Sequence, residues 1–139
     1  MKNKSLDANL IKKYHQDIVY NYSEYPTLDH WDTDYRDKDY KKSLIDWLPK
    51  NKDKPITFYV HIPFCEQLCW FCTCSKFITK NYDHVKDYLK YLHKEIDLLF
   101  KILNENKIKL NVGTVYFGGG SPTYLNREDL KELVDKLKG

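Results

Sequence analysis

The stretch "ITFYVHIPFCEQLCWFCTC", residues 56–74, decides the fold. Apolar side chains occupy every second position over residues 56–62, which is the period of a β-strand. Pro55 and Pro63 bound this alternation on either side. We therefore predict a strand over 56–62 that leads directly into a loop rich in cysteine.

Two helices and a second strand are predicted after this loop. Residues 82–104 carry apolar side chains at steps of three and four, and "NREDLKELVDKLKG" at 126–139 repeats that pattern, with Asn126 as its cap. Between them, "VGTVYF" at 112–117 has the composition of a strand. The order strand, loop, helix, strand, loop, helix predicts an α/β fold with parallel strands and right-handed crossovers.

The residues before the first strand are predicted to form an arm of helical and extended segments. Residues 5–20 have a helical period, whereas 22–40 are polar and aromatic and are interrupted by Pro26. A short helix is predicted within 40–51, and it should stop before Pro49 because the residue before a proline avoids the helical region.

The chain is therefore divided into an arm, 1–54, and the start of an α/β domain, 55–139. Two βα units cannot close a barrel, since a complete α/β barrel takes about 250 residues. The sequence is expected to be the front of a larger enzyme.

Composition and charge exclude several classes of protein. The formal net charge is +3, from 23 basic and 20 acidic residues spread along the chain, so no basic face for nucleic acid is indicated. No apolar run approaches the roughly 18 residues that span a bilayer, and the N-terminus lacks the apolar core of a secretory signal. We expect a cytoplasmic protein whose cysteines stay reduced.

All 4 cysteines lie in one short loop: Cys65, Cys69, Cys72 and Cys74. Zinc normally takes four ligands from two separated pairs, and a loop this compact reaches a metal more easily with three thiols than with four. Iron–sulfur clusters accept such loops, and three thiolates on a four-iron cluster leave one iron open. An iron–sulfur cluster is the favoured interpretation, with zinc or a redox thiol cluster as alternatives.

A second motif, "GGGSP" at 118–122, follows the second strand. Glycines let a ligand lie against bare backbone, although a tight turn between strand and helix can require glycine by itself. The pattern is not GxGxxG, so dinucleotide binding is not indicated.

These motifs together resemble a known enzyme family. A Cx3Cx2C loop directly after a first strand is similar to that of radical S-adenosylmethionine (SAM) enzymes. The elements "YVHIPFC", "CTC", "GGGSPTYL" and "SEYPT" resemble the oxygen-independent coproporphyrinogen III oxidase (dehydrogenase) family, most strongly over 55–80 and 113–125. Thr73 and Ser121 stand where that family usually has Gly and Thr. The resemblance implies that this chain forms the first two βα units of a radical SAM partial (β/α) barrel.

The resemblance also implies a metal site. Cys65, Cys69 and Cys72 would ligate a 4Fe–4S cluster, and SAM would chelate the fourth iron through its amino and carboxylate groups. Cys74 would be a thiol that does not bind the cluster.

Five further positions correspond to SAM-contacting residues of the family: Tyr59, Phe71, Gly119, Gly120 and Ser121. For Phe71 the alternative is a core aromatic, and for Tyr59 an ordinary tyrosine on the face of a strand. The N–H and C=O groups of the glycine turn would pair with the methionine end of SAM.

The histidines give weaker signals. His61 lies on the first strand, and we predict that it supports the cysteine loop, the alternative being a contact with the cluster or a substrate carboxylate. His84 and His93 have no ligand spacing and are predicted to be solvated.

The activity implied by the resemblance is the oxidative decarboxylation of two propionates to vinyl groups, which gives protoporphyrinogen IX in haem biosynthesis. The expected partners are the porphyrinogen substrate and a reduced flavodoxin or ferredoxin, with no nucleic acid and no membrane, and the full-length protein is expected to be a monomer. The alternatives are a related radical SAM protein with another role, such as haem transfer, or an inactive or zinc-binding fragment.

Overall fold

The structure, a computed structural model, describes residues 33–138. The chain divides into two compact units, Met1–Arg36 and Asp37–Gly139, and the second holds all the helices and strands that the structure describes. The predicted helix over 5–20 and most of the predicted arm lie outside the described residues.

Helix α2 (Asp37–Trp47) precedes the sheet, and a short 3-10 turn, η2 (Pro49–Asn51), follows it. The helix ends before Pro49, as predicted. Helix α2 begins at Asp37, earlier than expected, so the prediction of an extended segment over 22–40 is wrong for residues 37–40. Asp37 and Asp39 lie in the first turn, where negative charge is favourable beside the helix N-terminus.

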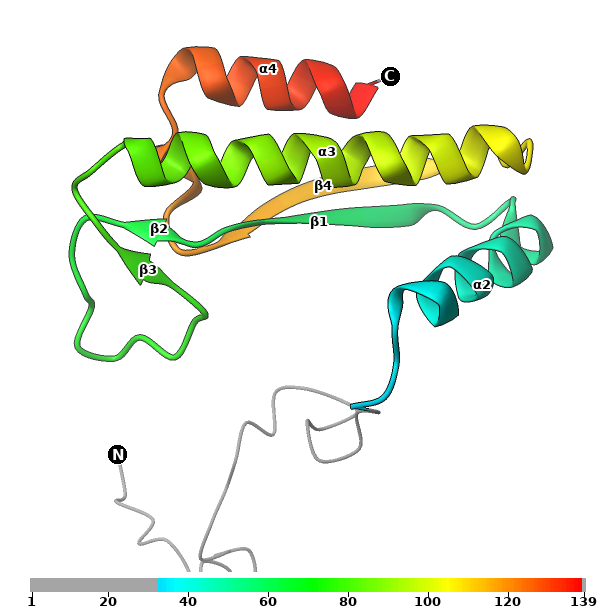
Figure 1. Cartoon of the computed structure of the whole chain (residues 1–139), viewed down its shortest axis with the longest axis horizontal. Coiled ribbons are helices and arrows are strands. Elements are labelled where there is room, and N and C mark those ends of the chain that lie inside the picture. Colours follow the sequence, from blue (N-terminus) through cyan, green and yellow to red (C-terminus); the bar gives the residue numbers. More distant parts are fainter. Residues whose placement is uncertain (1–32, 139) are drawn as a thin grey trace, which may run out of the picture. The chain divides into compact units, whose positions relative to one another are not determined.

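The predicted α/β order is confirmed (Figure 1). The remaining elements, in chain order, are β1 (Ile56–Ile62), β2 (Phe64–Cys65), β3 (Phe77–Ile78), α3 (Asp83–Glu105), β4 (Val112–Gly119), the 3-10 turn η3 (Pro122–Tyr124) and α4 (Arg127–Lys138). Within the described part of the chain, no helix has the length and apolar character needed to cross a membrane.

Strands β1 and β4 form a parallel pair. Tyr59 lies opposite Tyr116, and Ile62, the last residue of β1, lies opposite Gly119, the last residue of β4. The carboxyl ends of the two strands therefore meet at the same edge. The cysteine loop and the glycine turn both start from this edge, so the register of the sheet brings the two sequence motifs together.

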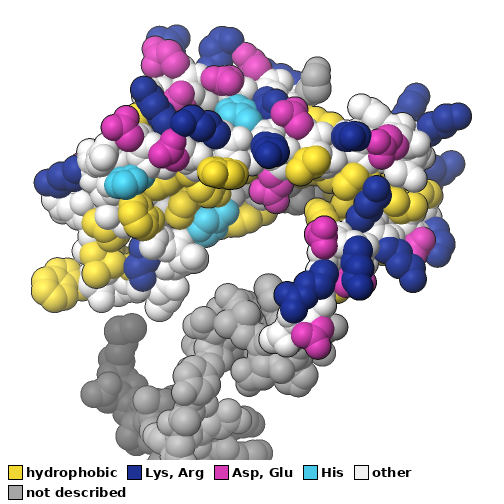
Figure 2. Space-filling view, in the orientation of Figure 1, with side chains coloured by type: hydrophobic (Ala, Val, Ile, Leu, Met, Phe, Trp, Pro, Cys, Tyr) yellow, Lys and Arg dark blue, Asp and Glu magenta, His cyan; other side chains and the backbone are white. Residues whose placement is uncertain are grey.

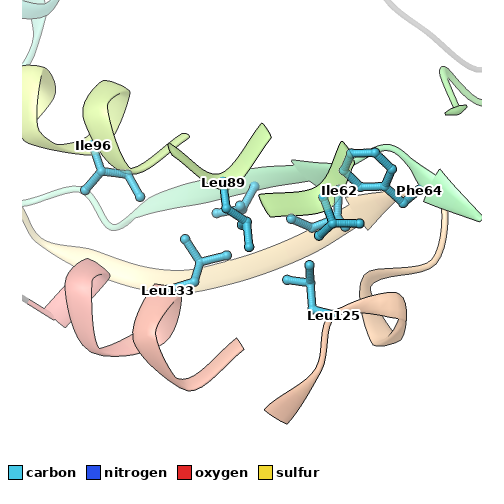
Figure 3. Packing of buried hydrophobic residues seen from close by; sticks show 8 residues of the cluster. Ile62, Phe64, Leu89, Ile96, Leu125 and Leu133 are labelled. Atoms are coloured by element: carbon cyan, nitrogen blue, oxygen red, sulfur yellow. The ribbon is translucent and has the colours of Figure 1, made fainter. Parts of the chain in front are cut away.

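Helices α3 and α4 lie on one face of this sheet (Figure 1). Because side chains alternate along a strand, Val60 and Ile62 of β1 point into the core while their neighbours point to the other face. Figure 3 shows Leu89 of α3 beside Leu133 of α4, and both belong to the same buried cluster as Ile62. Ile62 and Leu133 are fully buried, and each such side chain stabilises the fold by roughly 1.5–3 kcal/mol.

The opposite face of the sheet carries exposed aromatic side chains. Tyr59 is 56% exposed and Tyr116 is 59% exposed. Figure 2 shows charged side chains over the outer surface of the helices and hydrophobic side chains uncovered at the level of the sheet. The two faces of the sheet thus differ: one is packed by helices, and the other presents aromatic rings.

His93, predicted to be solvated, is largely buried. Its side chain is 17% exposed, its Nε2 lies 3.8 Å from Glu132 Oε1, and its Nδ1 is buried without a hydrogen-bond partner. The prediction is wrong because α4 packs onto α3 and covers a position that the periodicity of α3 alone places outside its apolar face.

Tyr82 ties the start of α3 to the start of α4. Its hydroxyl donates to Asp129 Oδ2 at 2.6 Å and accepts from the Asn126 N–H at 2.9 Å. Asn126 Oδ1 in turn accepts from the Asp129 N–H at 2.8 Å, which confirms Asn126 as the cap of α4. Burial, and next the hydrogen bond donated to Asp129, raise the pKa of Tyr82 to about 12.

Replacing Tyr82 by Phe should lower the free energy of unfolding at pH 7 by roughly 1 kcal/mol, because the hydrogen bonds to Asp129 and Asn126 are lost. The difference from wild type should shrink as the pH rises from about 10 to about 12. In that window the unfolded tyrosine has lost its proton while the folded one keeps it, so the wild type loses stability that the variant never had. Urea unfolding at pH 7 and pH 11 measures both effects.

The matched control is Tyr91→Phe, since Tyr91 lies on the same helix and is 74% exposed. Equal stability losses for the two variants at pH 7 would show that the Tyr82 hydroxyl does not connect the helices.

Candidate functional site

The glycine turn is bonded to the segment that follows β1. The Gly120 N–H donates to the Ile62 carbonyl at 2.8 Å, and the Ser121 N–H donates to the Phe64 carbonyl at 2.8 Å. These two bonds extend the parallel pairing of β1 and β4 by two residues into the loops. The turn is therefore fixed against the start of the cysteine loop.

The other carbonyls of the same segment hold the returning end of the cysteine loop. The Phe77 N–H donates to the Pro63 carbonyl at 2.7 Å, and the Thr79 N–H donates to the Cys65 carbonyl at 3.0 Å. These bonds form the short parallel pair β2–β3. This pairing was not predicted, although the β-forming run "FIT" at 77–79 is a local signal for it.

The first cysteine meets the glycine turn directly. The Sγ atom of Cys65 lies 3.5 Å from the Oγ atom of Ser121, although the two residues are far apart in the sequence. Cys65 is half-buried, whereas Ser121 is exposed. The structure thus brings one predicted cluster ligand and one predicted SAM-contacting residue into contact.

The middle of the loop carries the other predicted ligands. The Cys72 N–H donates to the Cys69 carbonyl at 3.0 Å, which places both residues in one turn, and Lys76 Nζ donates to the Cys72 carbonyl at 3.3 Å. All four thiols are free. Among the described residues, no three His, Cys, Asp or Glu side chains are gathered closely enough to hold a metal ion.

These residues fit an iron–sulfur cluster by the chemistry of their donors. Iron–sulfur clusters are held by cysteine thiolates, and this loop supplies three of them. Both ends of the loop are hydrogen-bonded to strands, whereas the hydrogen bonds of its middle are mainly to other residues of the loop. Cys65, Cys69 and Cys72 would hold the cluster, and the loop would have to draw the thiols together around it.

Phe71 and Cys74 lie on the exposed part of the loop. Phe71 is 86% exposed, so the alternative that it is a core aromatic is wrong. Cys74 is also exposed. The next residue, Ser75, forms a hydrogen bond to His61 of the sheet. Cys74 is therefore held near His61.

His61 connects the sheet to the cysteine loop. Its Nε2 lies 2.9 Å from the Ser75 carbonyl, and its Nδ1 lies 3.1 Å from the Tyr59 hydroxyl. Because a carbonyl only accepts, Nε2 carries the proton, and in a neutral ring Nδ1 then accepts from the Tyr59 hydroxyl. The geometry agrees with the predicted role of His61 in supporting the loop.

The glycines of the turn are needed for packing inside the protein. Gly119 has φ +106°, and a Cβ there would lie 2.7 Å from the His61 ring. A Cβ on Gly120 would lie 2.7 Å from the Pro63 and Phe64 carbonyl oxygens. The N–H groups of Gly120 and Ser121 and the Ser121 carbonyl are bonded within the fold, so this turn would offer a ligand its remaining acceptors, among them the Ser121 hydroxyl.

Comparison with known proteins bears on what this site does. A model described as "Radical SAM superfamily" matches residues 59–139. The oxygen-independent coproporphyrinogen III oxidase of Mannheimia haemolytica is 33% identical over 132 residues, and that of Pseudomonas aeruginosa is 34% identical over 132 residues. In both comparisons the match covers 95% of this chain.

A solved structure is also similar. The coproporphyrinogen III oxidase from Escherichia coli, described as a radical SAM enzyme, superimposes with a TM-score of 0.74 at 30% identity and covers 96% of this chain. The match covers 84% of the Mannheimia sequence but 27% of the Pseudomonas and Escherichia proteins. The chain thus spans about a quarter of the length of these last two relatives.

The glycine turn gives a test of this packing. Gly120→Ala should lower the free energy of unfolding by about 1–3 kcal/mol, because the new methyl group meets two carbonyl oxygens that are fixed by hydrogen bonds. Gly118→Ala should cost less than Gly120→Ala, since the three atoms nearest to its methyl group belong to the exposed side chains of Tyr59 and Tyr116, which move more easily than backbone carbonyls. Urea denaturation of both variants measures the difference, and equal costs would contradict this account of the turn.

Proposed function

Because this chain belongs to the radical SAM superfamily and, within it, to the family of oxygen-independent coproporphyrinogen III oxidases, we propose that it supplies the cluster-binding and SAM-binding segment of such an enzyme. The proposed reaction converts two propionate side chains of coproporphyrinogen III to vinyl groups without oxygen. Each propionate loses one hydrogen atom to a carbon radical, and then carbon dioxide and one electron, and protoporphyrinogen IX results.

Cys65, Cys69 and Cys72 would hold a 4Fe–4S cluster, and SAM would bind beside it. When bound, this pair supplies reductive cleavage of the sulfonium and hence a carbon radical able to take hydrogen atoms from unreactive C–H bonds. The protein's part is to hold the ligands in place and to exclude competing reactions.

The contact between Cys65 and Ser121 is the observation that carries the proposal. Each of them comes from a motif typical of the family, and the parallel register of β1 and β4 places the two 3.5 Å apart. A cluster on the cysteine loop would therefore lie beside the glycine turn that is proposed to contact SAM. In α/β barrels the chemistry lies at this same end of the strands.

His61 and Tyr59 would keep the loop and the SAM site in a fixed relation. His61 binds the Ser75 carbonyl through Nε2 and the Tyr59 hydroxyl through Nδ1, and with a neutral ring that hydroxyl donates to Nδ1. The Tyr59 oxygen then keeps its lone pairs for a ligand donor, such as the ammonium group of SAM. Gly119, Gly120, Ser121 and Phe71 complete the proposed SAM-contacting set.

The proposal includes partners that the sequence suggested. A reduced flavodoxin or ferredoxin would supply the electron, in the cytoplasm, and the porphyrinogen would be the substrate. The match covers 27% of the relatives from Pseudomonas and Escherichia, so residues outside this chain are proposed to complete the substrate site.

Anaerobic reconstitution with iron and sulfide tests the proposal. The expected product is a brown protein whose EPR signal, after reduction, changes when SAM is added. A colourless protein that holds one zinc ion would overturn the proposal. Turnover of coproporphyrinogen III, with a reduced flavodoxin as donor, tests the substrate, and a SAM-dependent EPR change without turnover would indicate another radical SAM reaction.

Cys74→Ser should leave the cluster in place, whereas alanine at Cys65, Cys69 or Cys72 should abolish it. The reason is that three thiolates and SAM complete the coordination of the four irons, so the fourth thiol is not required. Iron and sulfide content after reconstitution, together with the visible spectrum, measures cluster occupancy. Loss of the cluster in Cys74→Ser equal to the loss in Cys72→Ala would show that the ligand assignment is wrong.

A further inference from the structure

Two tyrosine rings lie together on the open face of the sheet, beside the proposed SAM site. Tyr59 of β1 and Tyr116 of β4 are register partners, and their rings stack with centroids 5.8 Å apart and an interplanar angle of 22°. Both side chains are more than half exposed. We call this pair the aromatic shelf. No sequence motif pointed to Tyr116.

Gly118 makes this arrangement possible. A Cβ on Gly118 would lie 2.7 Å from Cε2 of Tyr59 and 2.9 Å from Cε1 of Tyr116. Both rings therefore pack against the backbone of Gly118, the first residue of the glycine turn. The shelf is thus continuous with that turn and, through the bonds from Tyr59 to His61 and from His61 to Ser75, with the cysteine loop.

The shelf offers electron-rich surfaces and carries no positive charge of its own. The Tyr59 hydroxyl lies 3.1 Å from His61 Nδ1, which holds the Tyr59 ring beside the cysteine loop that His61 contacts through Ser75. The faces of aromatic rings attract cations, and a neighbouring phenolic oxygen adds to this attraction.

We propose that the aromatic shelf binds the positively charged sulfonium end of SAM, and that Tyr116 is a ligand-contacting residue that gives the site its preference for this cation over the neutral thioether. This inference rests on the proposed function, because it needs SAM to occupy the site beside the cluster. It adds a residue and a basis of selectivity to that site.

The test compares two ligands that differ in one methyl group and one charge. The affinities of SAM and of S-adenosylhomocysteine, which is neutral at sulfur, are measured by titration calorimetry on the anaerobically reconstituted chain. Tyr116→Leu should weaken SAM binding by about 3- to 30-fold and change the affinity for S-adenosylhomocysteine less than about twofold. Tyr116→Phe should bind both ligands like the wild type, since it keeps the ring.

Val115→Ala is the matched control. Val115 is the preceding residue on β4, is 39% exposed, and points to the opposite face of the sheet, so its loss should alter neither affinity. Melting temperatures of all variants verify that each is folded.

Four results would overturn the inference. Wild-type affinities for both ligands in Tyr116→Leu, or equal weakening of both, would show that Tyr116 does not select the cation. Loss of the preference in Tyr116→Phe would assign it to the hydroxyl group. If the wild-type chain takes up the cluster but binds neither ligand, both the proposed function and the inference fail. If the wild-type chain binds SAM but Tyr116→Leu does not change the preference, only the inference about Tyr116 fails.

Discussion

The site depends on the carbonyl groups of four consecutive residues, Ile62 to Cys65. The carbonyls of Ile62 and Phe64 accept from the glycine turn, and those of Pro63 and Cys65 accept from the returning end of the cysteine loop. The segment therefore behaves as a short central strand, although it lies beyond the end of the sheet. Because each carbonyl has a partner, the two loops are fixed to one backbone, and Cys65 is fixed with them.

The glycine turn follows from this constraint. Two loops bonded to the same extended segment lie so close that a Cβ on Gly120 would meet carbonyl oxygens, and one on Gly119 would meet the His61 ring. The sequence suggested that the glycines are bare so that a ligand can approach. In the structure, the groups that come close to these glycines belong to the protein itself: the carbonyls of the cysteine-loop segment and the His61 ring. Two of the N–H groups of the turn form hydrogen bonds within the protein. The role of the turn is first to build the site, and only its remaining acceptors can face a ligand.

The parts of the fold that could be predicted from sequence are those fixed by local periodicity. The alternation in β1, the helical period of α3 and the cap at Asn126 each specify their own element. What could not be predicted depends on contacts between distant segments: the pairing of β2 with β3, the burial of His93 under α4, and the stacking of Tyr116 on Tyr59. The family motifs supplied the candidate ligands, but they did not indicate that Phe71 is exposed or that His61 reaches Ser75.

The alternation along β1 separates stability from chemistry within a single strand. Val60 and Ile62 are buried against the helices, whereas Tyr59 and His61, one position before each of them, lie on the open face and connect to the loop. A shift of β1 by one residue would move Tyr59 into the core and would move Val60 and Ile62 to the open face. The burial of Val60 and Ile62 therefore holds Tyr59 and His61 on the open face, beside the cysteine loop.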